Sequence, residues 1–281
     1  MTNIASSLAS ATELLTQSSE SAHLDAEVLL CHVLDKPRSH LRAWPEKELL
    51  TKQCTLFNNL VQQRQQGHPV AYLTGSREFW SRDFEVNSDV LIPRPDTELL
   101  IELSLDLLSN ITNPQLIDLG TGSGAIAITL AAERTDSTII ATDLSNKALN
   151  MAQKNAKKHQ VNNIQFLQSN WFSQITEDSQ FDLIISNPPY IDGNDPHLSQ
   201  GDVRFEPESA LIADNLGLKD IQTLCDQARQ FLKPNAVLLI EHGCDQKSAV
   251  QTIFNAFNYR HVKNHTDLSG NPRVTSGQWT P

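Results

Sequence analysis

Apolar residues near the start of the chain recur at the spacing of three to four residues that is typical of helices with one buried face. One stripe comprises Ile4, Leu8, Ala11 and Leu15, a second comprises Leu24, Val28, Cys31, Val33 and Leu34, and a third comprises Leu49, Leu56, Leu60 and Val61 and runs towards Gly67. Amphipathic helices of this length can enclose one small core. We therefore predict a helical domain over residues 1–75.

The pattern changes to that of a hairpin between residues 76 and 95. The apolar residues Phe79, Trp80, Phe84 and Val86 flank the polar sequence Ser81-Arg82-Asp83. Such a polar break between two short apolar runs is typical of a turn. The sequence Pro93-Arg94-Pro95 then interrupts regular structure. We predict a β-hairpin linker over residues 76–95, followed by a helix that Asp96 caps and that extends to Leu108.

From residue 96 to residue 281 short apolar strands alternate with helical patterns. Strands are predicted just before Gly120 and over residues 138–142, 164–168, 181–186 and 237–240, with a helix over residues 145–159. Alternation of this kind is typical of a doubly wound α/β sheet. After Tyr190 the periodicity is lost until about Leu216, so we predict a long loop over residues 191–215 that recognises a substrate.

The sequence Asn187-Pro188-Pro189-Tyr190 directly follows the apolar run 181–186. Proline has no N–H, so the strand must end here, where open α/β sheets bind their ligands. The Asn187 side-chain oxygen and the Pro188 carbonyl can each accept one N–H, and the Tyr190 ring can cover a flat face. This set suits a planar amino group and predicts a substrate-binding clamp of Asn187, Pro188, Pro189 and Tyr190, with Asn187, Pro188 and Tyr190 in catalytic roles. A plain strand-ending turn is the alternative.

A glycine-rich turn, Gly120-Thr121-Gly122-Ser123-Gly124, lies between the earliest predicted strand of this region and a helix with apolar residues at Ile126, Leu130 and Ala131. Glycines allow a ligand to approach the main chain closely. Asp143, at the end of the next strand, is placed to accept hydrogen bonds from both hydroxyls of a ribose. The pattern predicts a nucleoside-binding site, for which NAD binding and a simple packing turn are alternatives.

Together, the clamp and the glycine turn indicate transfer of a group to nitrogen from a donor that contains ribose. This order of elements resembles the S-adenosylmethionine-dependent methyltransferases that modify amino groups. A sulfonium donor carries no phosphate, and no phosphate-binding lysine follows these glycines. We assign no general base, because an amide nitrogen becomes strongly acidic once alkylated and can lose its proton to water.

Composition changes the expected substrate. The formal net charge is -11, from 22 basic and 33 acidic residues, which argues against a protein that scans nucleic acid with a basic surface. One cationic cluster, Lys154, Lys157, Lys158 and His159, closes a predicted helix, where the macrodipole favours positive charge.

The cysteines and the hydropathy indicate the compartment. Cys31, Cys54, Cys225 and Cys244 lack the spacing of a metal site or a redox pair, so we expect free thiols. No apolar stretch is long enough to span a membrane and no basic leader precedes the first helix, so we expect a cytoplasmic protein with no membrane partner.

Further blocks make a closer resemblance visible. They are 67–75 (Gly-His-Pro-Val-Ala-Tyr-Leu-Thr-Gly), 90–98 (Val-Leu-Ile-Pro-Arg-Pro-Asp-Thr-Glu), 201–207 (Gly-Asp-Val-Arg-Phe-Glu-Pro), 239–243 (Leu-Ile-Glu-His-Gly) and 273–275 (Arg-Val-Thr). With the clamp and the glycine turn, they resemble the HemK/PrmC family of protein-(glutamine-N5) methyltransferases, which act on peptide chain release factors. The resemblance covers essentially the whole chain.

The resemblance implies a Rossmann-like methyltransferase with a mostly parallel seven-stranded sheet and a small N-terminal helical domain. It implies that S-adenosylmethionine binds Gly120 to Gly124, Asp143, Trp171 and Asn187, without a metal. It also implies that residues 187–190 hold the glutamine of a Gly-Gly-Gln motif in a release factor. Asn170 stands where many relatives have aspartate, so its contact with the adenine stays open. We expect a monomer that does not bind nucleic acid directly.

Several residues and functions remain open at this point. Arg94 and Thr97 are candidates to border the donor pocket. Glu241 and His242 could approach the site but are expected to be solvated, and His197 is expected to lie on the surface. An adenine-N6 or guanine amino methyltransferase acting on nucleic acid is the second functional hypothesis. A non-catalytic interaction module with the same fold is the third.

Overall fold

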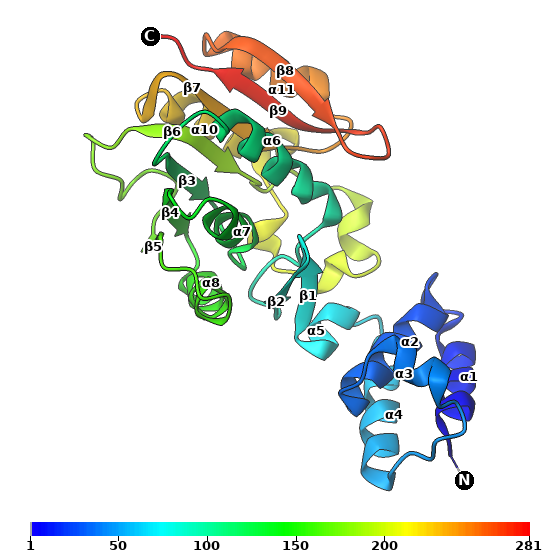
Figure 1. The fold of residues 1–281 in the computed structure, drawn as a ribbon. Coiled ribbons are helices and arrows are strands. Elements are labelled where there is room, and N and C mark those ends of the chain that lie inside the picture. The colour runs from blue at the N-terminus through cyan, green and yellow to red at the C-terminus, as the bar shows by residue number, and fades with distance from the viewer. Residues whose placement is uncertain (1) are drawn as a thin grey trace. The chain divides into compact units, whose positions relative to one another are not determined.

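A computed structural model describes residues 2–281, which divide into two compact units (Figure 1). One unit contains the chain up to Ser76 together with Ser199–Phe205. The other contains Arg77–Leu198 and Glu206–Pro281. The short segment 199–205 comes from the long loop that follows Tyr190, yet its contacts group it with the helical unit.

The helical unit contains α1 (Ile4–Leu15), α2 (Ala22–Leu34), α3 (Arg38–Ala43), α4 (Thr51–Gln65) and α5 (Val70–Thr74). The three helices predicted from periodicity are confirmed as α1, α2 and α4. Helices α3 and α5 have only six and five residues, too few to give a periodic signal. Their core includes Ile4, Leu15, Leu29, Leu30 and Phe57.

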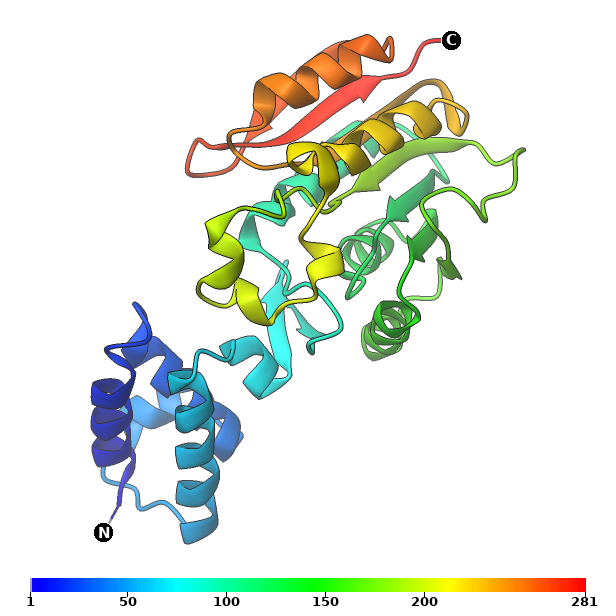
Figure 2. The same cartoon turned by 180° about the vertical axis from the view of Figure 1, so that it is seen from behind.

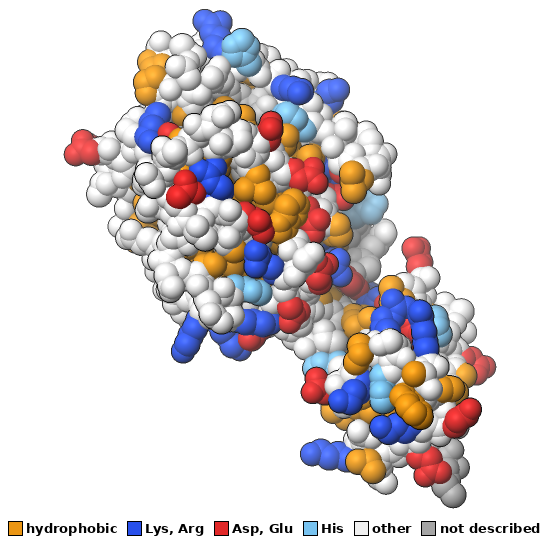
Figure 3. Space-filling model, viewed as in Figure 1, with side chains coloured by type: hydrophobic (Ala, Val, Ile, Leu, Met, Phe, Trp, Pro, Cys, Tyr) orange, Lys and Arg blue, Asp and Glu red, His pale blue; other side chains and the backbone are white. Residues whose placement is uncertain are grey.

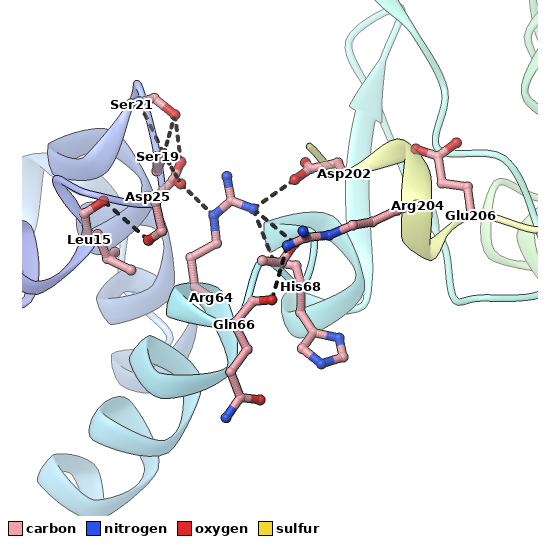
Figure 4. Close-up of polar contacts among 12 residues, drawn as sticks. Leu15, Ser19, Ser21, Asp25, Arg64, Gln66, His68, Asp202, Arg204 and Glu206 are labelled. Atoms are coloured by element: carbon pink, nitrogen blue, oxygen red, sulfur yellow. Dashed lines mark hydrogen bonds and ion pairs between the residues drawn. The ribbon is translucent and has the colours of Figure 1, made fainter. Parts of the chain in front are cut away.

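A buried polar cluster centred on Arg64 of α4 lies within this unit (Figure 4). The Arg64 Nε atom lies 2.7 Å from Oδ2 of Asp25, and its Nη1 atom lies 2.7 Å from Oδ1 of Asp202. The hydroxyls of Ser19 and Ser21 donate to the Asp25 carboxylate at 2.7 and 2.9 Å. One guanidinium thus joins helix α2 to the segment 199–205.

Gly67 and Arg204 also contact each other in the helical unit. Gly67 has a φ of +97°, and a Cβ atom there would lie 1.7 Å from Nη2 of Arg204. The same Nη2 donates to the Gln66 carbonyl at 3.1 Å, and the Phe205 ring packs on His68 with ring centres 4.4 Å apart. Two of the sequence blocks noted above therefore pack against each other.

Strands β1 (Ser76–Phe79) and β2 (Arg82–Glu85) form the predicted hairpin. The turn was predicted at Ser81-Arg82-Asp83, which is wrong by one residue, because Trp80 and Ser81 have positive φ values of 52° and 55° and Arg82 already belongs to β2. Two adjacent residues with positive φ suit the twist of a tight hairpin. Phe79 and Phe84 are buried.

The predicted cap of the next helix is wrong. A 3₁₀ turn, η1 (Pro95–Thr97), precedes α6 (Glu98–Leu108), and Thr97 occupies the cap position without a side-chain hydrogen bond to the helix. The Asp96 carboxylate instead lies 3.1 Å from Nε of Arg273. A long-range ion pair has replaced the local cap.

The second unit is built on the predicted seven-stranded, mostly parallel sheet. Its strands are β3 (Gln115–Leu119), β4 (Thr138–Asp143), β5 (Ile164–Gln168), β6 (Phe181–Ser186), β7 (Leu232–Glu241), β8 (Arg260–Thr266) and β9 (Pro272–Gln278). Their order is β5-β4-β3-β6-β7-β9-β8, and β9 runs antiparallel to both neighbours. The chain leaves β3 towards β4 and leaves β6 towards β7, so the order reverses between β3 and β6, where such sheets bind ligands.

Helices cover both faces of this sheet. Figure 1 shows α6, α7 (Ala125–Glu133) and α8 (Asn146–Lys158) in front of it, and Figure 2 shows α10 (Lys219–Ala228) and α11 (Lys247–Ala256) on the opposite side. Successive residues of a strand pack into the hydrophobic cores on opposite faces of the sheet. Leu183 packs on the side of α6 and α7, and Ile184 packs on the side of α10 and α11. Between β6 and α10 the chain forms only short elements, η2 (Pro196–Ser199), η3 (Val203–Phe205), η4 (Glu208–Ala210) and α9 (Asp214–Gly217).

Candidate active site

The glycine turn joins β3 to α7 at the carboxyl edge of the sheet. Gly120, Gly122 and Gly124 have positive φ values of 77°, 55° and 83°, which other residues adopt at a cost. A Cβ atom on Gly124 would lie 2.6 Å from Cδ1 of Ile128, so this glycine allows the turn to pack on its own helix. A Cβ atom on Gly120 would instead lie 3.5 Å from the Trp171 ring, in the space between turn and indole.

Asp143 lies at the end of β4, beside this turn. Its Oδ2 atom accepts a hydrogen bond from the Gly122 amide at 2.9 Å, and its Oδ1 atom accepts one from the Ser145 amide at 2.8 Å. Burial raises the pKa of this carboxyl, while the backbone donors oppose that rise. Each carboxylate oxygen has a second lone pair. Asp143 is therefore held in place and can still accept from a ligand.

A cavity of about 210 Å³ opens at this edge of the sheet. Its lining brings together six predicted site residues: Gly120, Gly122, Asp143, Trp171, Asn187 and Pro189. It also contains residues that the sequence analysis did not assign, among them Asp89, Leu91, Leu144, Ser145, Ser209 and Asp220. Leu91 lies in a block that was noted, and Leu144 and Ser145 directly follow Asp143, but nothing in the local pattern marks Asp220.

Trp171 has an unusual backbone at the wall of this cavity. Its φ is +49°, a left-handed conformation that is strained for a bulky residue and that tends to occur at functional sites. The Ser169 hydroxyl donates to the Trp171 carbonyl at 2.7 Å, which fixes the turn. The Trp171 side chain also lies beside the Asp220 carboxyl, whose pKa burial raises. The indole is therefore held against the cavity as well as against the core.

The other predicted site residues do not line the cavity. Thr121 is buried and donates to Oδ2 of Asp118 at 2.7 Å, and the Ser123 carbonyl accepts from Nδ2 of Asn155 at 2.9 Å. These contacts, like those of Gly124, hold the turn on β3 and on the helices behind it. Their contact with a donor, and the roles of Pro188 and Tyr190, stay predictions.

Asn187 and Pro188 follow the last residue of β6. Ser186, buried, donates its hydroxyl to the Leu119 carbonyl at 2.7 Å and so joins the ends of β6 and β3. Asn187 borders the cavity, and its Nδ2 atom donates to Oγ1 of Thr97 at 3.3 Å. Pro188 is buried. The segment 187–190 therefore starts at a point that the sheet itself fixes.

The Tyr190 backbone is held by Gln246, which directly precedes α11, and by Gly217 in the segment that follows β6. Its carbonyl accepts from Nε2 of Gln246 at 2.9 Å, and a Cβ atom on Gly217 would lie 2.0 Å from the same carbonyl oxygen. Burial raises the pKa of the phenol, so it remains protonated at neutral pH.

The expectation that Glu241 and His242 are solvated is wrong, because both side chains are buried at the end of β7. His242 Nδ1 lies 2.8 Å from the Gly243 carbonyl, which can only accept, so Nδ1 carries the ring proton. Nε2 then accepts from Thr275 at 2.9 Å and Asn264 at 3.0 Å. Burial lowers the pKa of His242, and its contacts are structural.

Neither Arg94 nor Thr97 lines the cavity. Arg94 Nη2 lies 2.5 Å from Oε1 of Glu206, and Thr97 contacts Asn187. His197 is exposed, as predicted, and its Nδ1 atom lies 2.7 Å from Oδ1 of Asp195.

The cationic cluster at the end of α8 is engaged by the hairpin. Lys158 Nζ lies 2.8 Å from Oδ2 of Asp83, and Lys154 pairs with Glu85. On the face drawn in Figure 3, basic side chains lie among acidic ones.

All four cysteines have free thiols, as predicted. No helix in residues 2–281 combines the length and apolar character that a membrane crossing requires. No group of three or more His, Cys, Asp or Glu side chains is placed to hold a metal ion in the described chain.

Comparison with known proteins places both units in described families. Residues 6–75 match the PrmC N-terminal domain, and residues 96–203 match the methyltransferase small domain. Among solved structures, a methyltransferase from Pyrococcus furiosus has a TM-score of 0.54 at 16% identity and covers 80% of this chain and 100% of its own. The 16S rRNA N2 G1207 methyltransferase RsmC of T. thermophilus has a TM-score of 0.56 at 20% identity, covering 73% of this chain and 49% of its own. These likenesses show the methyltransferase fold.

Curated relatives are similar over nearly the whole chain. A release factor glutamine methyltransferase of Vibrio cholerae is 48% identical over 277 residues, which are 98% of this chain and 96% of the relative. One of Aliivibrio fischeri is 47% identical over 95% of this chain and 93% of its own. One of Shewanella oneidensis is 49% identical over 94% and 92%. With the fold and the glycine turn already described, these matches show that the chain belongs to the release factor glutamine methyltransferase family.

Proposed function

We propose that the protein methylates N5 of the glutamine in the Gly-Gly-Gln motif of peptide chain release factors, with S-adenosylmethionine as the donor. The observation that carries this proposal is the presence of Gly120, Asp143 and Asn187 around one cavity, at the point where the strand order reverses. Family membership supports the choice of a release factor as the substrate. The product would be a modified factor for translation termination.

The residues of the cavity suit the donor. The glycine turn leaves its main chain uncovered beside the Trp171 ring, where a Cβ atom on Gly120 would lie 3.5 Å from the ring. The Asp143 carboxylate has unused lone pairs for two ribose hydroxyls, and the indole offers a flat apolar surface for an adenine. Gly120, Gly122, Asp143 and Trp171 would hold the donor, with Thr121, Ser123 and Gly124 shaping the turn. This role needs no metal.

S-Adenosylmethionine, when bound, supplies a methyl group whose carbon–sulfur bond breaks as a carbon–nitrogen bond forms, after which the amide loses a proton to water. The protein's own contribution is to hold a poor nucleophile still. Asn187 Oδ1 and the Pro188 carbonyl would each accept one N–H of the glutamine amide, while the Tyr190 ring would cover its flat face and Pro189 would border the donor. Such orientation contributes roughly 7–11 kcal/mol where the geometry is good.

The same proposal assigns a role to each part of the chain. Residues 1–75 would bind the release factor, residues 76–95 would link the domains, and residues 96–281 would carry out methyl transfer. The loop 191–215 would recognise the substrate. Because release factors work on ribosomes, the enzyme would be cytoplasmic, and we expect a monomer.

The test is to incubate the protein with labelled S-adenosylmethionine and a purified release factor and to map the label by mass spectrometry. Label on the glutamine of the Gly-Gly-Gln motif supports the proposal. A release factor with glutamine replaced by asparagine is the control and should remain unlabelled. Label in DNA or RNA, with none in the release factor, would contradict the proposal and favour a nucleic-acid amino methyltransferase.

A further inference from the structure

A buried carboxyl group lies directly behind the clamp. Glu241 is the last residue of β7, is 1% exposed, and belongs to the strand next to β6. Ser186 of β6 pairs with Ile240 of β7, so the next residues, Asn187 and Glu241, stand side by side at the carboxyl edge. Burial of an ionised acid is unfavourable unless the acid is paired and hydrogen-bonded, so the position of Glu241 behind the clamp calls for a role.

The side chains of Thr97 and Asn187 lie beside the Glu241 carboxyl and favour its ionised form. Asn187 Nδ2 also donates to Oγ1 of Thr97 at 3.3 Å, and the Thr97 side chain is buried. The Oε2 atom of Glu241 is buried and has no hydrogen-bond partner among the residues described.

Counting donors and acceptors fixes the orientation of the Asn187 amide. A side-chain amide has two N–H donors at one end and an acceptor oxygen at the other. A carboxylate can only accept, so neighbouring side chains can bond it only through their donors, and Nδ2 of Asn187 already donates to Oγ1 of Thr97. The N–H end of the Asn187 amide therefore faces Thr97 and Glu241 behind the clamp, and Oδ1 is left for the cavity.

We propose that Glu241, together with Thr97, is a positioning residue that holds the Asn187 amide with its Oδ1 atom towards the substrate. The inference rests on the proposed role of Asn187 in binding the glutamine amide. If the Asn187 amide were rotated by about 180°, it would present its N–H groups to the substrate amide nitrogen, which also carries only N–H groups. The transfer geometry would then be lost.

Protonation of Glu241 would weaken this arrangement, because a protonated carboxyl has a donor of its own that could bond Oδ1 of Asn187. Burial raises the pKa of Glu241 to about 7. The negative charge of Asp96 adds to this rise, while Thr97, Asn187 and the positive charge of Arg273 oppose it. The charged and titratable groups that face it are Arg273, Asp96 and Tyr190. Activity should therefore fall as the pH drops through about 7.

The test compares Glu241→Gln, Thr97→Val and Thr97→Ser with the wild type, measuring kcat and KM for a release factor and Kd for S-adenosylmethionine. Glu241→Gln and Thr97→Val should each lower kcat by on the order of 10-fold or more while donor Kd changes less than twofold. Thr97→Ser keeps the hydroxyl and should restore most of the activity. Glu241→Gln should also remove the fall in kcat below pH 7.

Thr129→Val is the matched control. The Thr129 hydroxyl of α7 is buried and, within residues 2–281, has no hydrogen-bond partner, so its loss should leave kcat unchanged. Should Glu241→Gln fail to fold, the comparison of Thr97→Val with Thr97→Ser still decides the matter.

The outcomes separate this inference from the proposed function. Wild-type kcat in both Glu241→Gln and Thr97→Val, with Asn187→Ala inactive, would overturn the inference and leave the proposed function intact. Full activity of Asn187→Ala would remove both the proposed role of Asn187 and the inference. Equal losses of kcat and donor affinity in Thr97→Val, without rescue in Thr97→Ser, would indicate a structural role only and also overturn the inference.

Discussion

The Gly122 amide donates a 2.9 Å hydrogen bond to the Asp143 carboxylate. This contact joins the turn after β3 to the end of β4, and the Gly120 and Thr121 amides reinforce it by donating to the Thr142 carbonyl at 2.9 and 2.8 Å. The turn and the carboxylate therefore form one rigid wall of the cavity before any ligand binds.

Asp143→Ala should weaken donor binding by on the order of 10-fold or more, because hydrogen bonds to a charged group contribute about 1.5–3 kcal/mol each. Calorimetric titration with S-adenosylmethionine measures the effect. Glu177→Ala, at an exposed acidic residue remote from the cavity lining, is the control and should bind normally. Unchanged affinity in Asp143→Ala would rule out the ribose-binding role.

Asn187→Ala should leave donor affinity within about twofold and lower kcat by about 100-fold or more, since loss of one preorganised polar contact has effects of that size. Single-turnover kinetics with a release factor separate binding from chemistry. Asn150→Ala on the exposed face of α8 serves as the control. Equal turnover of Asn187→Ala and wild type would contradict the assignment of Asn187.

The strands, the glycine turn and the position of residues 187–190 directly after β6 were predictable because each is encoded in a short continuous segment. The apolar run 181–186 and the two prolines that follow it define the end of β6 without reference to the rest of the chain. Asp143 was found in the same way, at the end of a predicted strand. The glycine turn, Asp143 and residues 187–190 lie at one edge of the sheet, so the strand order brings them together.

Residues whose role depends on distant partners were not predictable. Glu241 looked like a solvated strand end, and its burial follows from the position of β7 between β6 and β9. The local sequence suggested that Asp96 caps a helix, but Asp96 instead forms an ion pair with Arg273, which lies far along the chain. Asp220 meets Trp171 only because α10 packs beside the cavity. No local pattern carries such information.

Arg64→Met should destabilise the helical unit by about 3 kcal/mol, because it leaves the Asp25 carboxylate buried without its cation. Urea denaturation followed by circular dichroism measures the loss. Residues 199–205 should also be cleaved faster in limited proteolysis, since the contact with Asp202 is lost. Arg42→Met, at a side chain that is 70% exposed, is the control. Identical stability and cleavage in Arg64→Met and Arg42→Met would show that the cluster is not stabilising.

Asp118→Asn should make the protein more stable at alkaline pH. Burial raises the pKa of Asp118 from 3.8 to about 7, and the Asp143 charge adds to the rise, while hydrogen bonds from Thr121 and the Ala127 backbone oppose it. A raised pKa in the folded state means that the stability contributed by the neutral acid is fully present below pH 3.8. It is lost as the pH rises through about 7, and each pKa unit corresponds to about 1.4 kcal/mol.

Asparagine keeps an oxygen that can accept from Thr121 but cannot ionise, so the variant avoids this loss. The Tm of Asp118→Asn relative to wild type should therefore be higher at pH 8 than at pH 5, by roughly 2–4 °C for each kcal/mol. Asp106→Asn, on the exposed face of α6, should show no such dependence. Glu241, whose pKa burial also raises to about 7, remains in the variant, so some decline in stability with rising pH should persist. A Tm difference that is the same at both pH values would mean that Asp118 stays ionised in the folded protein throughout this range.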